Sequence, residues 1–386
     1  MGTQMDTAAI GRRQGELREQ AGQALARVIE PVVARLAPGQ RLSAADMREI
    51  YKGLAPLGYL GSTIPKSEGG AGMSYVEYGL LLEALARAPV VLGEIVPPRT
   101  VFYLGDQAQK DRWLPRLLAG DLVSTAAITE PQAGSDLRSM TTTALANGDH
   151  FVLEGRKKWI KLGGVADLMT VLAITDPETG YKSMSRVIVE RDASPWTATE
   201  LPSVGIRNLS YAEVAFDSLK VPKDNLLGDA GSGVAGFSRG IEASRAIVGL
   251  QAAGIARAAL DLAVAYTKTR VAFGRPIAKF QAVQIALAEA AARVEASRSL
   301  AIGALQILDA GRRCPREASM AKFFATETSV SACATAIGCM GAYGLSEEAG
   351  VERHWRNAMM LTAIDGASDI QRLIVGREEL GMAAFV

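Results

Sequence analysis

The chain has 386 residues, more than one hydrophobic core usually spans, so two or three domains are expected. Hydrophobic residues make up 48% of the chain, which is ample for a large core. The 42 Lys and Arg residues are balanced by 41 Asp and Glu residues. The resulting net charge of +1 gives no overall basic field that would favour nucleic acid or a membrane surface.

Disulfide and metal chemistry find little support in the sequence. Cys314, Cys333 and Cys339 form no spaced framework, and no His or Cys cluster has the spacing of metal ligands, so no metal site is expected. The first 20 residues lack the apolar core of a signal peptide, and charged residues interrupt the most apolar stretch, residues 231–266. A cytoplasmic enzyme without a membrane span is therefore expected.

Helical patterns dominate the first third of the chain. Apolar residues recur at helical spacing between positions 17 and 32, with charged residues between them. A turn-rich segment, residues 57–74, precedes a second helical pattern over 75–88, and a third covers 107–118. These patterns predict an N-terminal helical domain over residues 1–123.

The middle of the chain changes to short β-branched or alternating runs separated by Gly, Asn, Asp and Pro. This change predicts a small antiparallel, β-barrel-like domain over residues 124–232. Long amphipathic runs rich in Ala and Leu follow, over 241–267, 281–310 and 316–337. They predict a C-terminal four-helix-type bundle over residues 233–386. The expected fold class is α+β and mostly helical.

Six segments spread along the chain carry a more specific signal. They are AITEPQAGSD (127–136), KKWI (157–160), EVAFDSLKVPKDNLLG (213–228), RVAFGRPIAKFQAVQ (270–284), GAYGLSEEAGVERHWRNA (341–358) and IDGASDIQRLIVGRE (364–378). In this order and spacing they resemble the acyl-CoA dehydrogenase family over nearly the whole chain. The resemblance implies that family's fold, bound FAD, an acyl-CoA or carrier-bound acyl thioester as substrate, an electron-transfer flavoprotein or similar acceptor, and a homotetramer.

The first two segments are those that lie against the flavin ring in the family. The resemblance assigns Thr129 and Ser135 to the isoalloxazine, with Ser135 also beside the substrate, and Trp159 to a face of the ring. Without the resemblance, Trp159 reads more simply as a core residue. The family usually has Ser or Thr two positions after this tryptophan, where this chain has Lys161. In one interpretation the Lys161 ammonium approaches flavin N5. In the interpretation that we favour, the side chain points to solvent and only the backbone amide contacts the cofactor.

Two later segments resemble the family's site for the FAD pyrophosphate and adenosine, which a neighbouring subunit contributes. The resemblance assigns Arg270, Phe273 and Gln281 to this role, and an arginine suits phosphate. The segment that includes Gly341 usually opens with Gln, where this chain has Gly338. One hydrogen bond to the cofactor is then missing or replaced. An ordinary helix cap and loop is the alternative reading of this group.

Oxidising a thioester at Cα and Cβ requires a base, donors for the thioester carbonyl and a hydride acceptor. The family base is usually a glutamate before a glycine, and the matching residues here are Asp365 and Gly366. Aspartate is shorter by one methylene, or about 1.5 Å. The substrate is then expected to sit closer or to differ in shape, for example as a branched or alicyclic acyl group. The alternatives are nitroalkane-oxidase-like or other flavin oxidase or monooxygenase chemistry, or a structural Asp365.

Two further residues, Arg245 and Arg99, complete the expected substrate site. Some family members carry the base just before the position of Arg245, but Ser244 occupies that place and cannot be a base at neutral pH. Glu242 would point to a different face of the helix. Arg245 either tunes the carboxylate and assists substrate binding or is an exposed helix residue. Arg99 would bind a distal carboxylate if it were buried, although a solvated loop arginine is the favoured reading.

Overall fold

The computed structural model describes residues 7–37, 39–234 and 237–384. Its N-terminal helices are α1 (Thr7–Ala24), which continues through a π-helical turn (Leu25–Ile29) into α2 (Glu30–Ala34), then α3 (Ala44–Leu54), α4 (Tyr75–Leu85), α5 (Pro97–Leu104) and α6 (Gln107–Leu118). Reciprocal capping boxes start α3, α4 and α6, with Ser43, Ser74 and Asp106 as the N-cap residues.

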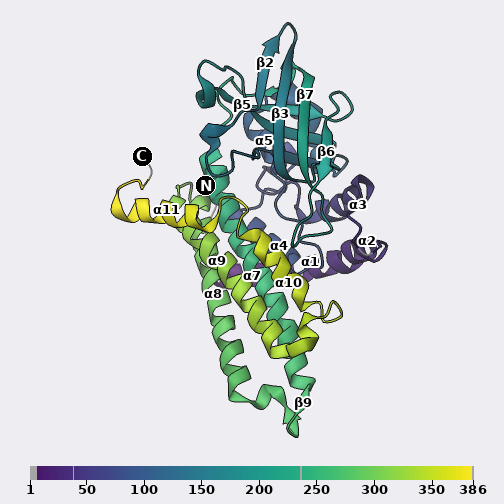
Figure 1. The fold of residues 1–386 in the computed structure, drawn as a ribbon, viewed down its shortest axis with the longest axis vertical. Coiled ribbons are helices and arrows are strands. Elements are labelled where there is room, and N and C mark those ends of the chain that lie inside the picture. Colours follow the sequence, from purple (N-terminus) through teal and green to yellow (C-terminus); the bar gives the residue numbers. More distant parts are fainter. Residues whose placement is uncertain (1–6, 38, 235–236, 385–386) are drawn as a thin grey trace.

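The central strands form one twisted sheet above the helices (Figure 1). They are β1 (Ser124–Ala127), β2 (Thr143–Asn147), β3 (His150–Lys161), β4 (Leu168–Ile174), β5 (Met184–Glu190), β6 (Thr197–Glu200), β7 (Tyr211–Pro222) and β8 (Leu226–Leu227). The strand order is β6-β7-β3-β2-β4-β5-β8, with β1 beside β4. Most pairs are antiparallel as predicted, but β4 pairs in parallel with both β1 and β2. The long connections before β4 permit this parallel pairing, which short hairpins would not.

The C-terminal helices form an elongated bundle below the sheet (Figure 1). They are α7 (Phe237–Thr269), α8 (Gln281–Asp309), α9 (Pro315–Met340), α10 (Val351–Leu361) and α11 (Ser368–Leu380), and the short strands β9 (Val271–Ala272) and β10 (Arg275–Pro276) join α7 to α8. Small residues let α7, α8 and α9 approach closely, with Gly249 of α7 against Ala301 and Ala321. The predicted mostly helical α+β fold class is confirmed.

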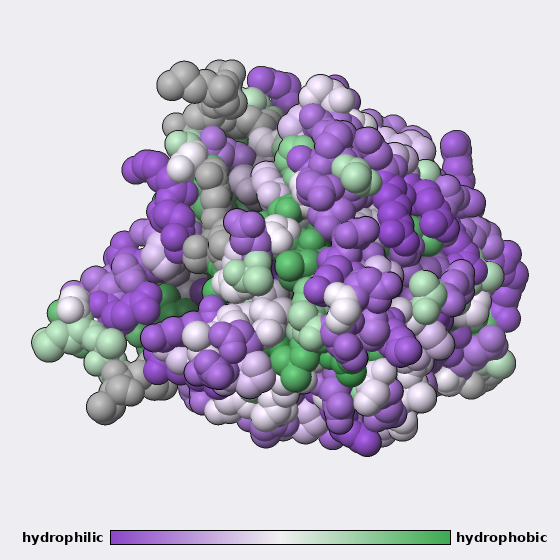
Figure 2. All heavy atoms as spheres, turned by 90° about the horizontal axis from the view of Figure 1, so that it is seen from above, coloured by the Kyte–Doolittle hydropathy of each residue, from purple (hydrophilic) through white to green (hydrophobic). Residues whose placement is uncertain are grey.

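Helix α7 is long and apolar enough to cross a membrane by length and composition alone. However, 78% of its most apolar window is buried inside the bundle, as expected of a core helix. The face at the β-domain end is mostly hydrophilic, with hydrophobic side chains exposed in a narrow area near its centre (Figure 2).

Candidate active site

The loop between α10 and α11 carries Asp365 in a rare backbone conformation. Asp365 has a φ of 55°, and Gly366 after it has a φ of 98°. Trp159 and Phe273 also have positive φ angles, of 62° and 51°. Non-glycine residues seldom adopt this region, and those that do often belong to functional sites. Three residues assigned to the base and the cofactor therefore share a conformation that the sequence pattern did not reveal.

The surroundings of Asp365 set its pKa at a value suited to a base. Burial raises the pKa of the carboxyl to about 6, and the negative charge of Glu94 acts in the same direction. Arg245, Lys322 and Lys161 oppose this shift with their positive charges. Arg245 Nε also donates a hydrogen bond to the Asp365 carbonyl at 3.2 Å, so this arginine is part of the site rather than an exposed helix residue.

A buried polar cluster lies beside this loop. Arg99 forms an ion pair with Glu94, and both side chains are almost fully buried. Ser244 Oγ donates a hydrogen bond to the second carboxylate oxygen of Glu94. Ser244 and Arg245 are consecutive on α7, so one turn of that helix contacts both Glu94 and Asp365.

The favoured reading of Arg99 as a solvated loop residue is wrong. Arg99 lies in α5 and is 8% exposed. The helix was missed because its eight residues include Thr, Val, Phe and Tyr, which are weak helix formers. Only the two prolines at its start mark it, since proline is favoured in the first helical turn.

Lys161 does not point to solvent, contrary to the reading that we favoured. Its Nζ donates a hydrogen bond to the backbone carbonyl of Glu94 at 2.8 Å, which joins the end of β3 to the loop before α5. Burial lowers the pKa of Lys161 to about 8, while Glu94 and Asp365 favour the charged form. The ammonium is therefore a component of the polar cluster near Asp365.

Glu242 is excluded as the base by its contacts. Its carboxylate pairs with Arg313 and accepts a hydrogen bond from the backbone N–H of Cys314 at 2.9 Å. These contacts lie on a different face of α7 from Ser244, as the helical spacing predicted.

The segment with Thr129 and Ser135 is held against the sheet by a buried ion pair. Lys157 Nζ lies 2.8 Å from the Glu130 carboxylate, and both side chains have 0% exposure. The Thr129 carbonyl accepts a hydrogen bond from the backbone N–H of Lys158 at 2.9 Å. Ser135 is exposed and Thr129 half-buried, so their hydroxyls remain accessible beside β3.

Trp159 is not the core residue that the sequence alone suggested. Its side chain is 50% exposed, and it lies where the pairing of β3 with β7 shifts register between Lys157 and Ile160. A bulge of this kind re-aims a side chain, here leaving a large aromatic ring open to a ligand. This arrangement fits a flat cofactor ring packed on the tryptophan.

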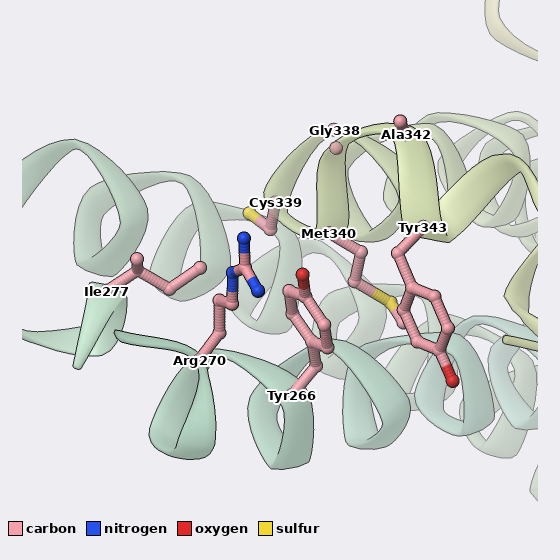
Figure 3. Close-up of a pocket in the computed structure, with 9 residues that line it drawn as sticks. Tyr266, Arg270, Ile277, Gly338, Cys339, Met340, Ala342 and Tyr343 are labelled. Atoms are coloured by element: carbon pink, nitrogen blue, oxygen red, sulfur yellow. The ribbon is translucent and has the colours of Figure 1, made fainter. Parts of the chain in front are cut away.

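The other predicted cofactor residues gather at the foot of the bundle. A groove of about 650 Å³ is lined by Arg270, Gly338 and Gly341, together with Tyr266 and Tyr343, whose rings stack 5.2 Å apart (Figure 3). Phe273 and Gln281 lie close by in the chain and are exposed, Phe273 to 94%. An exposed arginine beside glycine backbone and aromatic rings fits a phosphate and an adenine ring.

Within one chain, the candidate residues for the flavin ring lie far from those for the pyrophosphate and adenosine. Arg270 immediately precedes β9 at the foot of the bundle, whereas Thr129, Ser135 and Trp159 belong to the β-domain at its head (Figure 1). That a neighbouring subunit contributes the adenosine end of the site stays a prediction.

Three residues of the site were missed in the sequence. Glu94 lies between helices in a loop without periodicity, so nothing distinguished it. Lys322 carried a signal, because it falls on the apolar stripe of α9 with Ala318, Ala321 and Ala325. Gln371 lies inside the last resembling segment, but only the fold shows that it is completely buried.

Comparisons with known proteins match all three parts of the chain. The family models for the acyl-CoA dehydrogenase N-terminal, middle and C-terminal domains match residues 12–121, 125–219 and 231–380. The chain belongs to the acyl-CoA dehydrogenase family. It is 36% identical over 340 residues to an acyl-CoA dehydrogenase of Bacillus subtilis (strain 168), covering 86% of this chain and 90% of the relative.

Two other members of this family add detail. A cyclohex-1-ene-1-carbonyl-CoA dehydrogenase of Syntrophus aciditrophicus (strain SB) is 36% identical over 334 residues, covering 84% of this chain and 81% of the relative. The structure of a glutaryl-CoA dehydrogenase from Mycobacterium smegmatis with FADH2 has a TM-score of 0.86 and 25% identity, covering 99% and 97% of the two chains. The protein is therefore an oxidoreductase of a family whose members bind FAD and dehydrogenate acyl-CoA thioesters.

Proposed function

We propose that this enzyme dehydrogenates an acyl-CoA thioester, with Asp365 as the base that removes the Cα proton. The observation that carries the proposal is a half-buried carboxylate with a pKa of about 6, in a loop close to Lys161 at the end of β3. At neutral pH this group is mostly ionised, yet it remains basic enough to accept a proton. The backbone N–H of Asp365 donates to the thioester carbonyl, and Gly366 and Arg245 border the same subsite.

The residues at both ends of the molecule fit FAD. Thr129, Ser135 and Trp159 would hold the isoalloxazine, with Lys161 at its edge, and bound FAD supplies the acceptor for the hydride from Cβ. In a neighbouring subunit the pyrophosphate and adenosine would be held by Arg270, Phe273, Gln281, Gly338 and Gly341. The open Trp159 face and the groove around Arg270 support this assignment.

We propose a homotetramer that passes electrons to an electron-transfer flavoprotein or similar acceptor. Large hydrophobic side chains are exposed along the bundle, at Phe273, Ile285 and Leu345. Such exposure is typical of a surface that another subunit covers.

The substrate is proposed to be a neutral acyl group, branched or alicyclic, on coenzyme A or an acyl carrier protein. Glu94 already neutralises Arg99, so this arginine offers no free charge for a distal carboxylate. The shorter reach of Asp365 favours a substrate whose Cα lies closer to the loop than that of a linear acyl chain.

An Asp365→Asn variant tests the proposal. We expect it to keep FAD, seen in the visible absorbance, and to lose by at least about 1,000-fold the anaerobic bleaching of the flavin by acyl-CoA thioesters, because the amide cannot accept the proton. A panel of linear, branched, alicyclic and dicarboxylic acyl-CoAs identifies the substrate on the unmodified enzyme. Bleaching of the variant at an undiminished rate would place the base elsewhere.

A flavin oxidase on the same fold is the second candidate, because the Lys161 ammonium lies inside the site. A cation near the flavin edge changes its reaction with oxygen. Stoichiometric oxygen uptake with peroxide formation during turnover would favour the oxidase. Dye reduction without oxygen uptake would favour the dehydrogenase.

A further inference from the structure

Helix α9 carries a lysine that is unusual in being completely buried. Lys322 has 0% exposure, and in the described part of the chain the hydrogen-bond partners of its ammonium are backbone carbonyls rather than carboxylates. Burying an ammonium is costly unless it is well hydrogen-bonded. Its Nζ donates to the backbone carbonyls of Thr362 at 2.6 Å and Gly366 at 2.8 Å. Both carbonyls belong to the loop that carries Asp365.

A second buried side chain contacts the same loop from α11. Gln371 has 0% exposure, and its Nε2 donates to the carbonyls of Asp365 and Gly366, both at 3.1 Å. A Cβ at Gly366 would lie 2.5 Å from this nitrogen, so the glycine is needed for the close approach. The loop therefore has donors from α9 and α11, in addition to Arg245 from α7.

These hydrogen-bond donors stabilise a backbone conformation that Asp365 would otherwise disfavour. A left-handed conformation at a residue other than glycine costs roughly 1–2 kcal/mol, and the loop has Asp365 there. Thr362 also lies at the C-terminal end of α10, where the helix dipole favours a cation. Lys322 can thus fix the loop geometry and place a positive charge near the carboxylate at the same time.

We propose that Lys322 is a positioning residue that acts through Asp365, whereas Gln371 contributes geometry alone. This rests on the proposed role of Asp365 as the base. The pKa of the Asp365 carboxyl is shifted by the charges of Glu94, Arg245, Lys322 and Lys161. The pKa of the Lys322 ammonium is shifted by the charges of Asp365, Arg245 and Glu327. Of the two buried donors, only Lys322 brings charge.

The two roles predict different effects in a matched pair of variants, Lys322→Met and Gln371→Met. Both remove donors to the loop and leave an unbranched side chain of similar length. Each is expected to lower kcat about 10- to 100-fold, because a displacement of about 1 Å at the base is enough for such a loss. Each should also increase hydrogen exchange in residues 362–371 while leaving FAD bound.

Only Lys322→Met should also change the pH profile. Removing a nearby cation raises the pKa of Asp365, so the pH at which flavin bleaching becomes half-maximal should rise by about one unit. In Gln371→Met it should stay where it is in the unmodified enzyme. A Lys322→Met enzyme with normal kcat, or with an unchanged pH profile, would overturn the proposal, as would an equal shift in both variants.

A folding defect is separated from these outcomes by a third variant, Lys322→Arg, which keeps the charge and donors. This variant should be more active than Lys322→Met and should keep the pH profile of the unmodified enzyme. A shift of the pH profile equal to that of Lys322→Met would contradict the proposal. Failure of the proposed function itself is a distinct outcome, because no acyl-CoA would then bleach the flavin of the unmodified enzyme.

Discussion

At the scale of single residues, the site departs from the family where the chemistry is most sensitive. Asp365 is shorter than the usual glutamate, and Lys161 replaces a small hydroxyl residue. In the structure both side chains face the same polar cluster, where Glu94 and Arg99 neutralise each other. The departures are therefore spatially connected, although they are distant in the chain.

The raised pKa of Asp365 predicts how stability depends on pH. The folded protein binds this proton up to about pH 6, while the unfolded chain releases it near the ordinary value of 3.8. The folded state thus holds more protons between these values, and its stability from this group falls as pH rises through this window.

An Asp365→Asn variant should lack this fall. Because the loop is only partly buried, we expect a gain on the order of 1 kcal/mol at pH 7 and no gain at pH 3. Urea unfolding of both proteins at the two pH values measures the difference. If the variant is no more stable than the unmodified protein at pH 7, burial does not destabilise the ionised Asp365 carboxylate.

The sequence supplied candidate residues for the site but not their environments. The six segments supplied Asp365, Trp159 and Arg270 as candidates, because the family resemblance depends on sequence alone. Burial of Arg99 and the direction of Lys161 depend on how α5 and β3 meet across two domains. Such contacts join residues more than 60 positions apart, as between Lys161 and Glu94, and leave no local pattern.

At the scale of elements, the prediction succeeded where periodicity was long. The helix over 107–118 has the predicted bounds, and α8 (Gln281–Asp309) ends one residue before the predicted end. The first helical run was interrupted by a π-helical turn, and α5 was missed because its propensity is weak. The parallel partners of β4 could not be predicted, because pairing direction depends on topology rather than composition.

The ion pair between β3 and the segment with Thr129 and Ser135 should be a structural requirement. Lys157→Met leaves the Glu130 carboxylate buried without its partner, and breaking such a pair costs about 3–5 kcal/mol. We expect a large fall in thermal stability and loss of FAD. The adjacent Lys158→Met is a matched control, since Lys158 is 33% exposed and its pair with Glu213 should contribute at most about 1 kcal/mol. Similar stability of the two variants would contradict this role.

At the scale of the whole molecule, the proposed cofactor site is divided between the two ends of the chain. Strand β3, which carries Trp159, lies at the head, and β9, which follows Arg270, lies at the foot (Figure 1). On the proposed assignment, one FAD molecule would therefore need residues of another subunit. The sequence indicated this arrangement only through the family resemblance, since neither composition nor spacing reports on assembly.

Gly338 offers a test of the foot of the bundle. A Cβ there would meet no atom within 4 Å, so packing does not require glycine. Gly338→Gln should restore the amide usual in the family and tighten FAD binding several-fold, measured by titrating the apoprotein. Gly338→Ala should give only the helix-propensity gain of about 1 kcal/mol in stability. Equal FAD affinity in both variants would show that the groove does not use the amide.

The central claim is that Asp365 removes a proton from Cα, and deuterium exchange measures that step directly. The enzyme is incubated in D2O with an acyl-CoA analogue that carries sulfur in place of Cβ and so cannot lose hydride. Mass spectrometry should show deuterium entering Cα with the unmodified enzyme and at least about 1,000-fold more slowly with Asp365→Asn. Exchange at equal rates in both proteins would contradict the account.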